Sequence, residues 1–146
     1  MKDEAINEFA RNFLAIIAGA FTAIALAFIL FPLVKLVPAH SFEDYFSTPY
    51  SEIWKKDLPL LIAMAVWLFI ASLAGGFVCT ILSVDKELIY ALIGSLVCLT
   101  VLFVVSEGNV FEMRTWQSWI LLAAVPIGNI AGSSLGAAFK RKRKKA

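Results

Sequence analysis

Four long apolar segments, separated by short polar stretches, dominate the pattern of the chain. They cover residues 13–37, 59–83, 88–105 and 117–138. Each has about the 17–25 residues that an α-helix needs to cross a bilayer. Apolar and polar residues do not alternate within them, as they would in the strands of a membrane barrel. The pattern therefore predicts an all-α integral membrane protein, in which residues 1–146 form one bundle of four transmembrane helices.

The segments between the apolar runs are short. Residues 83–87 leave room only for a tight turn, so the second and third spans are expected to pack as an antiparallel hairpin. Residues 38–58 contain two helix starts, a capping box at Ser41–Asp44 and the pair Thr48-Pro49. Aromatic residues lie in the same stretch at near-helical spacing: Phe42, Tyr45, Phe46, Tyr50 and Trp54. We expect a short interfacial helical loop on the outer leaflet, and the alternative is an aromatic docking surface for a partner.

The composition supports a membrane location, and the distribution of cations predicts on which side of the membrane the termini lie. Hydrophobic residues make up 60% of the chain, against about 45–50% in soluble domains. The side that holds both termini carries nine cations, namely Lys2, Arg11, Lys86 and residues 140–145. The other side carries four, namely Lys35, Lys55, Lys56 and Arg114. Because cation-rich flanks stay in the cytoplasm, we expect both termini there, with a bacterial inner membrane as the location.

Small residues recur at intervals of four along the spans. The glycines among them are Gly19, Gly75, Gly76, Gly94, Gly128, Gly132 and Gly136. Small residues four apart flatten a helix face and let two backbones approach, which is how helices associate in lipid. We therefore expect these glycines at helix–helix contacts. In the first arrangement the contacts join the four helices of one chain. In the second, one small-residue face, above all that of the fourth span, packs against another chain. In the third, a glycine column lines the pore of an oligomer.

Two residues interrupt the apolar character of the fourth span. Pro126 removes a backbone hydrogen bond and favours a kink. Asn129 lies near the middle of the membrane, with Ser133 one turn later on the same face. Polar side chains at this depth usually form hydrogen bonds between helices, and contact with a polar ligand or an ion is the alternative.

Six consecutive cations follow the fourth span: Lys140, Arg141, Lys142, Arg143, Lys144 and Lys145. In the simplest interpretation the tail, residues 140–146, is an orientation signal. A basic cluster beside a membrane also attracts anionic headgroups, at roughly 1 kcal/mol per cation. Anionic membrane lipid is therefore the expected partner of the tail.

Residues that carry chemistry are scarce. The predicted spans contain no Asp, Glu, His or Arg, the residues that usually couple ions or relay protons within a membrane. His40 is the single histidine, and with Glu43 and Asp44 it gives only a weak metal-binding pattern. Cys79 and Cys98 lie in apolar runs and fit packing residues better than a redox pair. We expect no catalytic residue, no cofactor, no metal ion and no nucleic-acid partner.

A combination of packing motifs gives the chain a broad resemblance. Gly75-Gly76, a tryptophan at the head of the fourth span, the series Pro126-x-Gly128-x3-Gly132-x3-Gly136 and the basic tail resemble small four-span bacterial membrane proteins of unassigned function. The resemblance implies no activity and no site. We expect a non-enzymatic accessory or scaffold subunit that associates through small-residue helix faces, with itself or with another membrane protein. A small oligomeric transporter or channel is the alternative, and a lipid-modifying membrane enzyme is the third.

Overall fold

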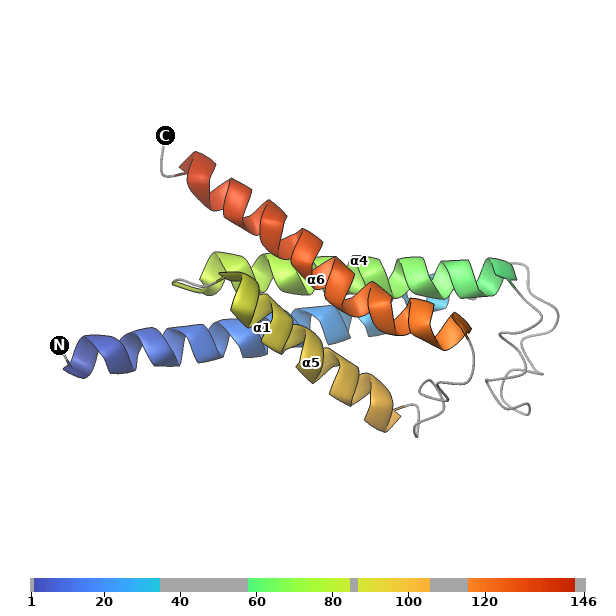
Figure 1. Ribbon diagram of the computed structural model, residues 1–146, viewed down its shortest axis with the longest axis horizontal. Helices are drawn as coiled ribbons and strands as arrows, with labels where there is room; N and C mark the ends of the chain where they lie inside the picture. The colour runs from blue at the N-terminus through green and yellow to red at the C-terminus, as the bar shows by residue number, and fades with distance from the viewer. Residues whose placement is uncertain (1, 35–57, 85–86, 106–115, 144–146) are drawn as a thin grey trace.

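The computed structural model describes residues 2–34, 58–84, 87–105 and 116–143. Its helices are α1 (Lys2–Val34), α4 (Leu58–Leu82), α5 (Glu87–Val105) and α6 (Trp116–Arg143) (Figure 1). All four are long and apolar enough to cross a membrane, and the described residues contain no strand. The predicted all-α integral membrane fold with four spanning helices is thus confirmed. The predicted helices of the 38–58 loop lie outside the described residues, apart from Leu58 at the start of α4.

Helix boundaries differ from the predicted spans at both ends of the chain. α1 begins at Lys2 and not at residue 13, because residues 2–18 contain neither glycine nor proline to stop the helix where the apolar run begins. α6 runs past the predicted end at residue 138 and includes the first cations of the tail. Cations are favourable in the last turn of a helix, since its carbonyl end carries a partial negative charge. The cationic tail is therefore helical through Arg143.

α4 occupies the middle of the bundle. It packs most extensively against α6 and α1, whereas α5 makes smaller contacts with each of the other three helices. Figure 1 shows α5 diverging from α4 after the turn that joins them. The second and third spans, which were predicted to form a hairpin, are thus in contact, but neither helix has the other as its main partner.

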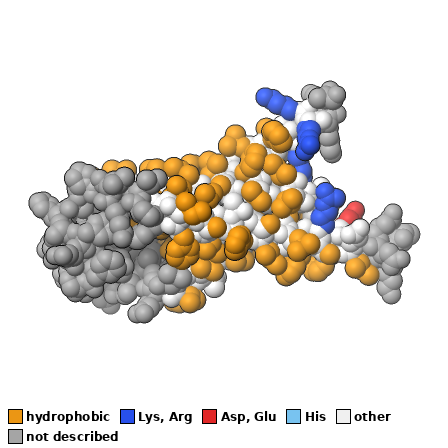
Figure 2. Space-filling model, turned by 180° about the vertical axis from the view of Figure 1, so that it is seen from behind, with side chains coloured by type: hydrophobic (Ala, Val, Ile, Leu, Met, Phe, Trp, Pro, Cys, Tyr) orange, Lys and Arg blue, Asp and Glu red, His pale blue; other side chains and the backbone are white. Residues whose placement is uncertain are grey.

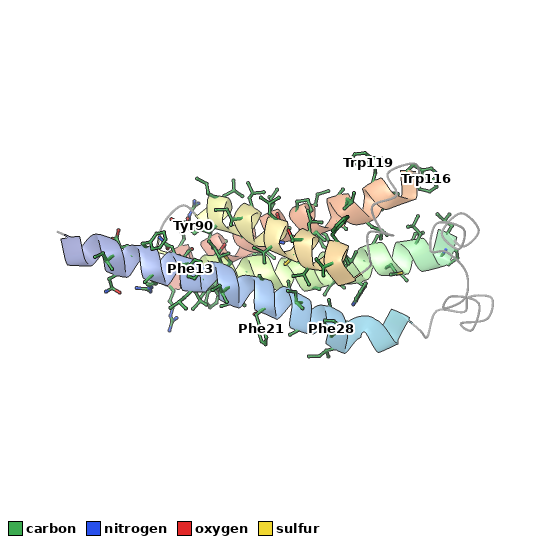
Figure 3. The ribbon with its side chains drawn as sticks, turned by 90° about the horizontal axis from the view of Figure 1, so that it is seen from below. Phe13, Phe21, Phe28, Tyr90, Trp116 and Trp119 are labelled. Carbon is green, nitrogen blue, oxygen red and sulfur yellow. The ribbon has the colours of Figure 1, made fainter. Side chains whose placement is uncertain are left out.

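Side chains are sorted by size between the inside and the outside of the bundle. Figure 2 shows hydrophobic side chains spread over much of the face that it displays. Phe13, Phe21 and Phe28 project outward from α1 (Figure 3) and are exposed. An exposed phenylalanine has no hydrophobic cost in lipid, so close packing holds the helices together instead. Many of the buried apolar residues are accordingly small: Ala15, Ala20, Ala23, Ala71, Ala91 and Ala124.

Candidate functional site

The glycine column of α6 lies against α4. A Cβ added at Gly128 would come within 2.6 Å of the Phe69 carbonyl oxygen, and one added at Gly132 would overlap the Leu73 carbonyl oxygen. Both opposing atoms belong to the backbone of α4, so they cannot rotate out of the way as a side chain would. The two helices therefore touch backbone to backbone at these residues, as small-residue faces in lipid allow.

The same contact continues toward the C-terminal end of α6. A Cβ at Gly136 would lie 2.9 Å from the Thr80 Cβ, and one at Gly76 of α4 would overlap the backbone oxygen of Asn129. The Thr80 hydroxyl also donates a hydrogen bond to the buried Ser133 hydroxyl, with the two oxygens 2.8 Å apart. Glycines thus line both sides of the α4–α6 contact, and one hydrogen bond between hydroxyl groups crosses it.

A second contact of small residues joins α1 to α4. A Cβ at Gly19 would lie 2.7 Å from the Cys79 Cβ, and one at Gly75 would lie 2.7 Å from the Gly19 carbonyl oxygen. Successive residues of a helix point about 100° apart. The adjacent pair Gly75-Gly76 is explained by this rotation, because Gly75 faces α1 while Gly76 faces α6.

Gly94 of α5 differs from the other six predicted packing glycines. No described atom of a neighbouring helix lies within 4 Å of a Cβ added there. A larger residue therefore fits at this position, and close approach of helices does not require glycine. Cys98, one turn later, and Cys79 are both buried and free, so they are not joined as a redox pair.

The polar side chains of α6 have different roles from one another. Asn129 is buried, and its Nδ2 donates to the Val125 carbonyl oxygen of its own helix at 3.2 Å. The interhelical hydrogen bond expected of it belongs instead to Ser133. The backbone of Asn129 lies against Gly76 of α4. Pro126 lies inside α6, which continues on both sides of it.

A polar cluster that was not predicted from the sequence lies where α1 passes the α4–α5 turn. Asn12 is only 5% exposed. Its Oδ1 accepts a hydrogen bond from the Val84 amide at 2.8 Å, and its Nδ2 donates to the Tyr90 hydroxyl at 3.1 Å. One side chain of α1 therefore holds both the turn and the start of α5. The signal in the sequence is small, because Asn12 is simply the last polar residue before the apolar run.

Lys140 reaches the same turn from α6. Its Nζ donates a hydrogen bond to the Ser83 carbonyl oxygen at 2.7 Å and lies 3.3 Å from a carboxylate oxygen of Glu87. The predicted role of Lys140 was contact with anionic lipid, but its ammonium group is bonded to the protein. We use the name turn clamp for the following residues: Asn12, Ser83, Val84, Glu87, Tyr90 and Lys140.

The other described cations of the tail are exposed. Arg141, Lys142 and Arg143 complete the last turn of α6. Figure 2 shows cationic side chains gathered at one end of the molecule. Residues 144–146 lie outside the described residues. Lipid binding by the tail therefore stays a prediction.

The comparisons with known proteins add no family to this description. No protein-family model matches the chain, and no curated protein or solved structure is significantly similar to it. Within the described part of the chain, no three His, Cys, Asp or Glu side chains are grouped so that they could hold a metal ion. The features that bear on function are therefore the two glycine contacts, the turn clamp and the exposed cations.

Proposed function

We propose that this chain is a non-enzymatic membrane protein that acts as an accessory or scaffold subunit, in an oligomer of its own or in a complex with another membrane protein. One observation carries the proposal: six buried polar side chains form hydrogen bonds within the bundle itself. They are Asn12, Thr80, Ser83, Ser95, Asn129 and Ser133. The bonds of Asn12, Thr80 and Ser133 link different helices. Those of Ser83, Ser95 and Asn129 go to backbone carbonyl oxygens three or four residues earlier. Side chains paired in these ways are engaged within the bundle, whereas groups that bind ions or relay protons usually face a pathway.

The surface left for a partner is the outer one. The glycine faces of α1, α4 and α6 are filled by each other. We therefore place association on lipid-facing side chains, such as Phe21 of α1 and Leu96 of α5, which are 71% and 62% exposed, rather than on the small-residue faces. A channel built around the fourth span would require the glycine column of α6 to turn away from α4.

Solubilisation in a mild detergent is expected to preserve a complex, which native mass spectrometry would identify as a homo-oligomer or as a defined assembly with a second membrane protein. In a protein whose native cysteines are replaced by alanine, a cysteine at Phe21 or Leu96 is expected to cross-link to the partner. A cysteine at Ser72, which is buried, is the control and should not. A monomer in the membrane would contradict the proposal, and ion flux through reconstituted vesicles would favour the channel.

We also propose a bacterial inner membrane as the location, with both termini in the cytoplasm. Two observations support this orientation. The first turn of α1 and the last turn of α6 lie at the same end of the molecule (Figure 1). The sequence assigns nine cations to that side and four to the other, and cation-rich flanks are retained in the cytoplasm.

A topology reporter fused after Ala146 is expected to report the cytoplasm, and one inserted near Thr48 is expected to report the opposite side. The physical reason is the cost of moving the cation-rich flank across the membrane. Alkaline phosphatase and green fluorescent protein, which are active on opposite sides of a bacterial inner membrane, provide the measurement. Phosphatase activity from the fusion after Ala146 would reverse the proposed orientation.

A further inference from the structure

The cations that end α6 are of two kinds. The Lys140 side chain is only 24% exposed, and its ammonium group is bonded to the Ser83 carbonyl oxygen and paired with Glu87. Arg141, Lys142 and Arg143 belong to the same helical turn, yet they are exposed. Neighbouring residues of one charge run thus have different surroundings.

The spacing along α6 accounts for the difference. Lys140 follows Gly128, Gly132 and Gly136 at intervals of four, so it continues the face of α6 that packs on α4. α4 ends at Leu82, and the last carbonyl groups of a helix have no partner within it. The glycine column of α6 therefore brings the Lys140 ammonium group to the Ser83 carbonyl oxygen, one residue beyond the end of α4. Arg141 and Lys142 are rotated from this face by about 100° and 200°. Arg143 lies almost a full turn farther along α6 than Lys140 and is exposed.

We propose that Lys140 is a structural residue of the turn clamp, and that Arg141, Lys142 and Arg143 form a binding surface for anionic phospholipid headgroups. A lipid fits best because α6 is continuous from its apolar part to its cationic end, which fixes these cations where the hydrocarbon stops. The exposed apolar side chain of Phe139 lies just before them. Guanidinium groups bind phosphate oxygens through two hydrogen bonds at once.

The first variant tests whether Arg141, Lys142 and Arg143 bind anionic headgroups. The protein is reconstituted in vesicles of equal parts phosphatidylcholine and phosphatidylglycerol, solubilised mildly, and analysed for the ratio of the two lipids that it retains. The triple variant Arg141→Gln, Lys142→Gln, Arg143→Gln is expected to lower the preference for phosphatidylglycerol by about fivefold per cation, the equivalent of ~1 kcal/mol each, with Tm close to wild type. High salt should weaken the wild-type preference, because exposed charges are screened.

The second and third variants test the structural role of Lys140. Lys140→Gln is expected to lower Tm, since the Glu87 carboxylate loses its partner, while the lipid preference stays close to wild type. Glu87→Gln breaks the same ion pair without altering the tail. It is expected to raise the preference for phosphatidylglycerol, because the Lys140 charge is no longer neutralised. This variant keeps the test decisive if Lys140→Gln fails to fold.

Two results would overturn the proposal. An unchanged lipid preference in the triple variant at low and high salt would mean that these three cations do not bind anionic headgroups and that the tail is only an orientation signal. A Lys140→Gln variant that loses the lipid preference at wild-type Tm would remove the structural role of Lys140. The triple variant keeps Lys140, Lys144 and Lys145, which preserves the cation excess that orients the chain. Neither result depends on the oligomeric state, so each is separable from the proposed scaffold function.

Discussion

Replacing Gly132 with alanine is expected to lower the thermal stability of the bundle sharply. The new methyl group would overlap the Leu73 carbonyl oxygen and lie 2.9 Å from the Phe77 amide nitrogen. Neither backbone atom can move unless α4 moves with it. Overpacking of a tight contact costs about 1–3 kcal/mol, and occasionally more, because it forces backbone shifts. The larger side chain of Gly132→Leu is expected to prevent α4 and α6 from packing at all.

Gly94→Ala is the matched control for this prediction. The same chemical change in α5 meets no described atom of another helix within 4 Å, and alanine is the better helix former by about 1 kcal/mol in water. Stability at or above wild type is therefore expected, measured as apparent Tm in the same detergent. Equal losses at both positions would contradict the special role of Gly132. Loss of an oligomer at wild-type monomer Tm would mean that the column faces another chain.

The number and position of the membrane helices could be predicted because the bilayer imposes one length and one composition on each of them. Both ends of α4 and α5 agree with the predicted spans to within one residue. The ends that differ lie where a helix continues into polar sequence, at Lys2 for α1 and at Arg143 for α6. Hydropathy locates the membrane, but it does not show where a helix stops.

The packing glycines could be located from the sequence, but their partners could not. An interval of four marks a flat helix face, and the neighbour that it meets depends on how the helices are arranged around α4. Gly75 and Gly76 are adjacent in the chain and face different helices. Gly94 follows the same pattern, yet no described atom of another helix lies within 4 Å of a Cβ added there. Spacing alone therefore identifies candidates for close approach without deciding which of them are in contact.

The turn clamp could not be predicted because it joins residues far apart in the chain. Asn12 precedes an apolar run and Lys140 begins a run of cations, two settings in which solvated side chains are the ordinary expectation. Both become structural only because α1 and α6 pass the same turn between α4 and α5. A run of cations can therefore include a residue, here Lys140, that is bonded to another part of the protein and has a structural role.

Asn12→Leu is expected to produce the second large loss of stability. It removes the acceptor of the Val84 amide and the donor to the Tyr90 hydroxyl, while leucine is close to asparagine in size. Each lost hydrogen bond costs about 0.5–1.5 kcal/mol, so the two lost together cost about 1–3 kcal/mol. Tyr90→Phe removes only the second interaction, so it is expected to lower Tm less than Asn12→Leu does.

Asn7→Leu is the control for Asn12→Leu, because it makes the same substitution at an exposed position of α1, where little change in Tm is expected. The loss should also be visible locally. In Asn12→Leu the Val84 amide has no acceptor, so its hydrogen should exchange with solvent faster than in wild type, while amides in the middle of α4 stay protected until the bundle opens. Hydrogen exchange followed by mass spectrometry or NMR measures this difference. If Asn12→Leu and Asn7→Leu lowered Tm equally and left exchange at Val84 unchanged, the hydrogen bond from α1 would add nothing to the stability of the turn.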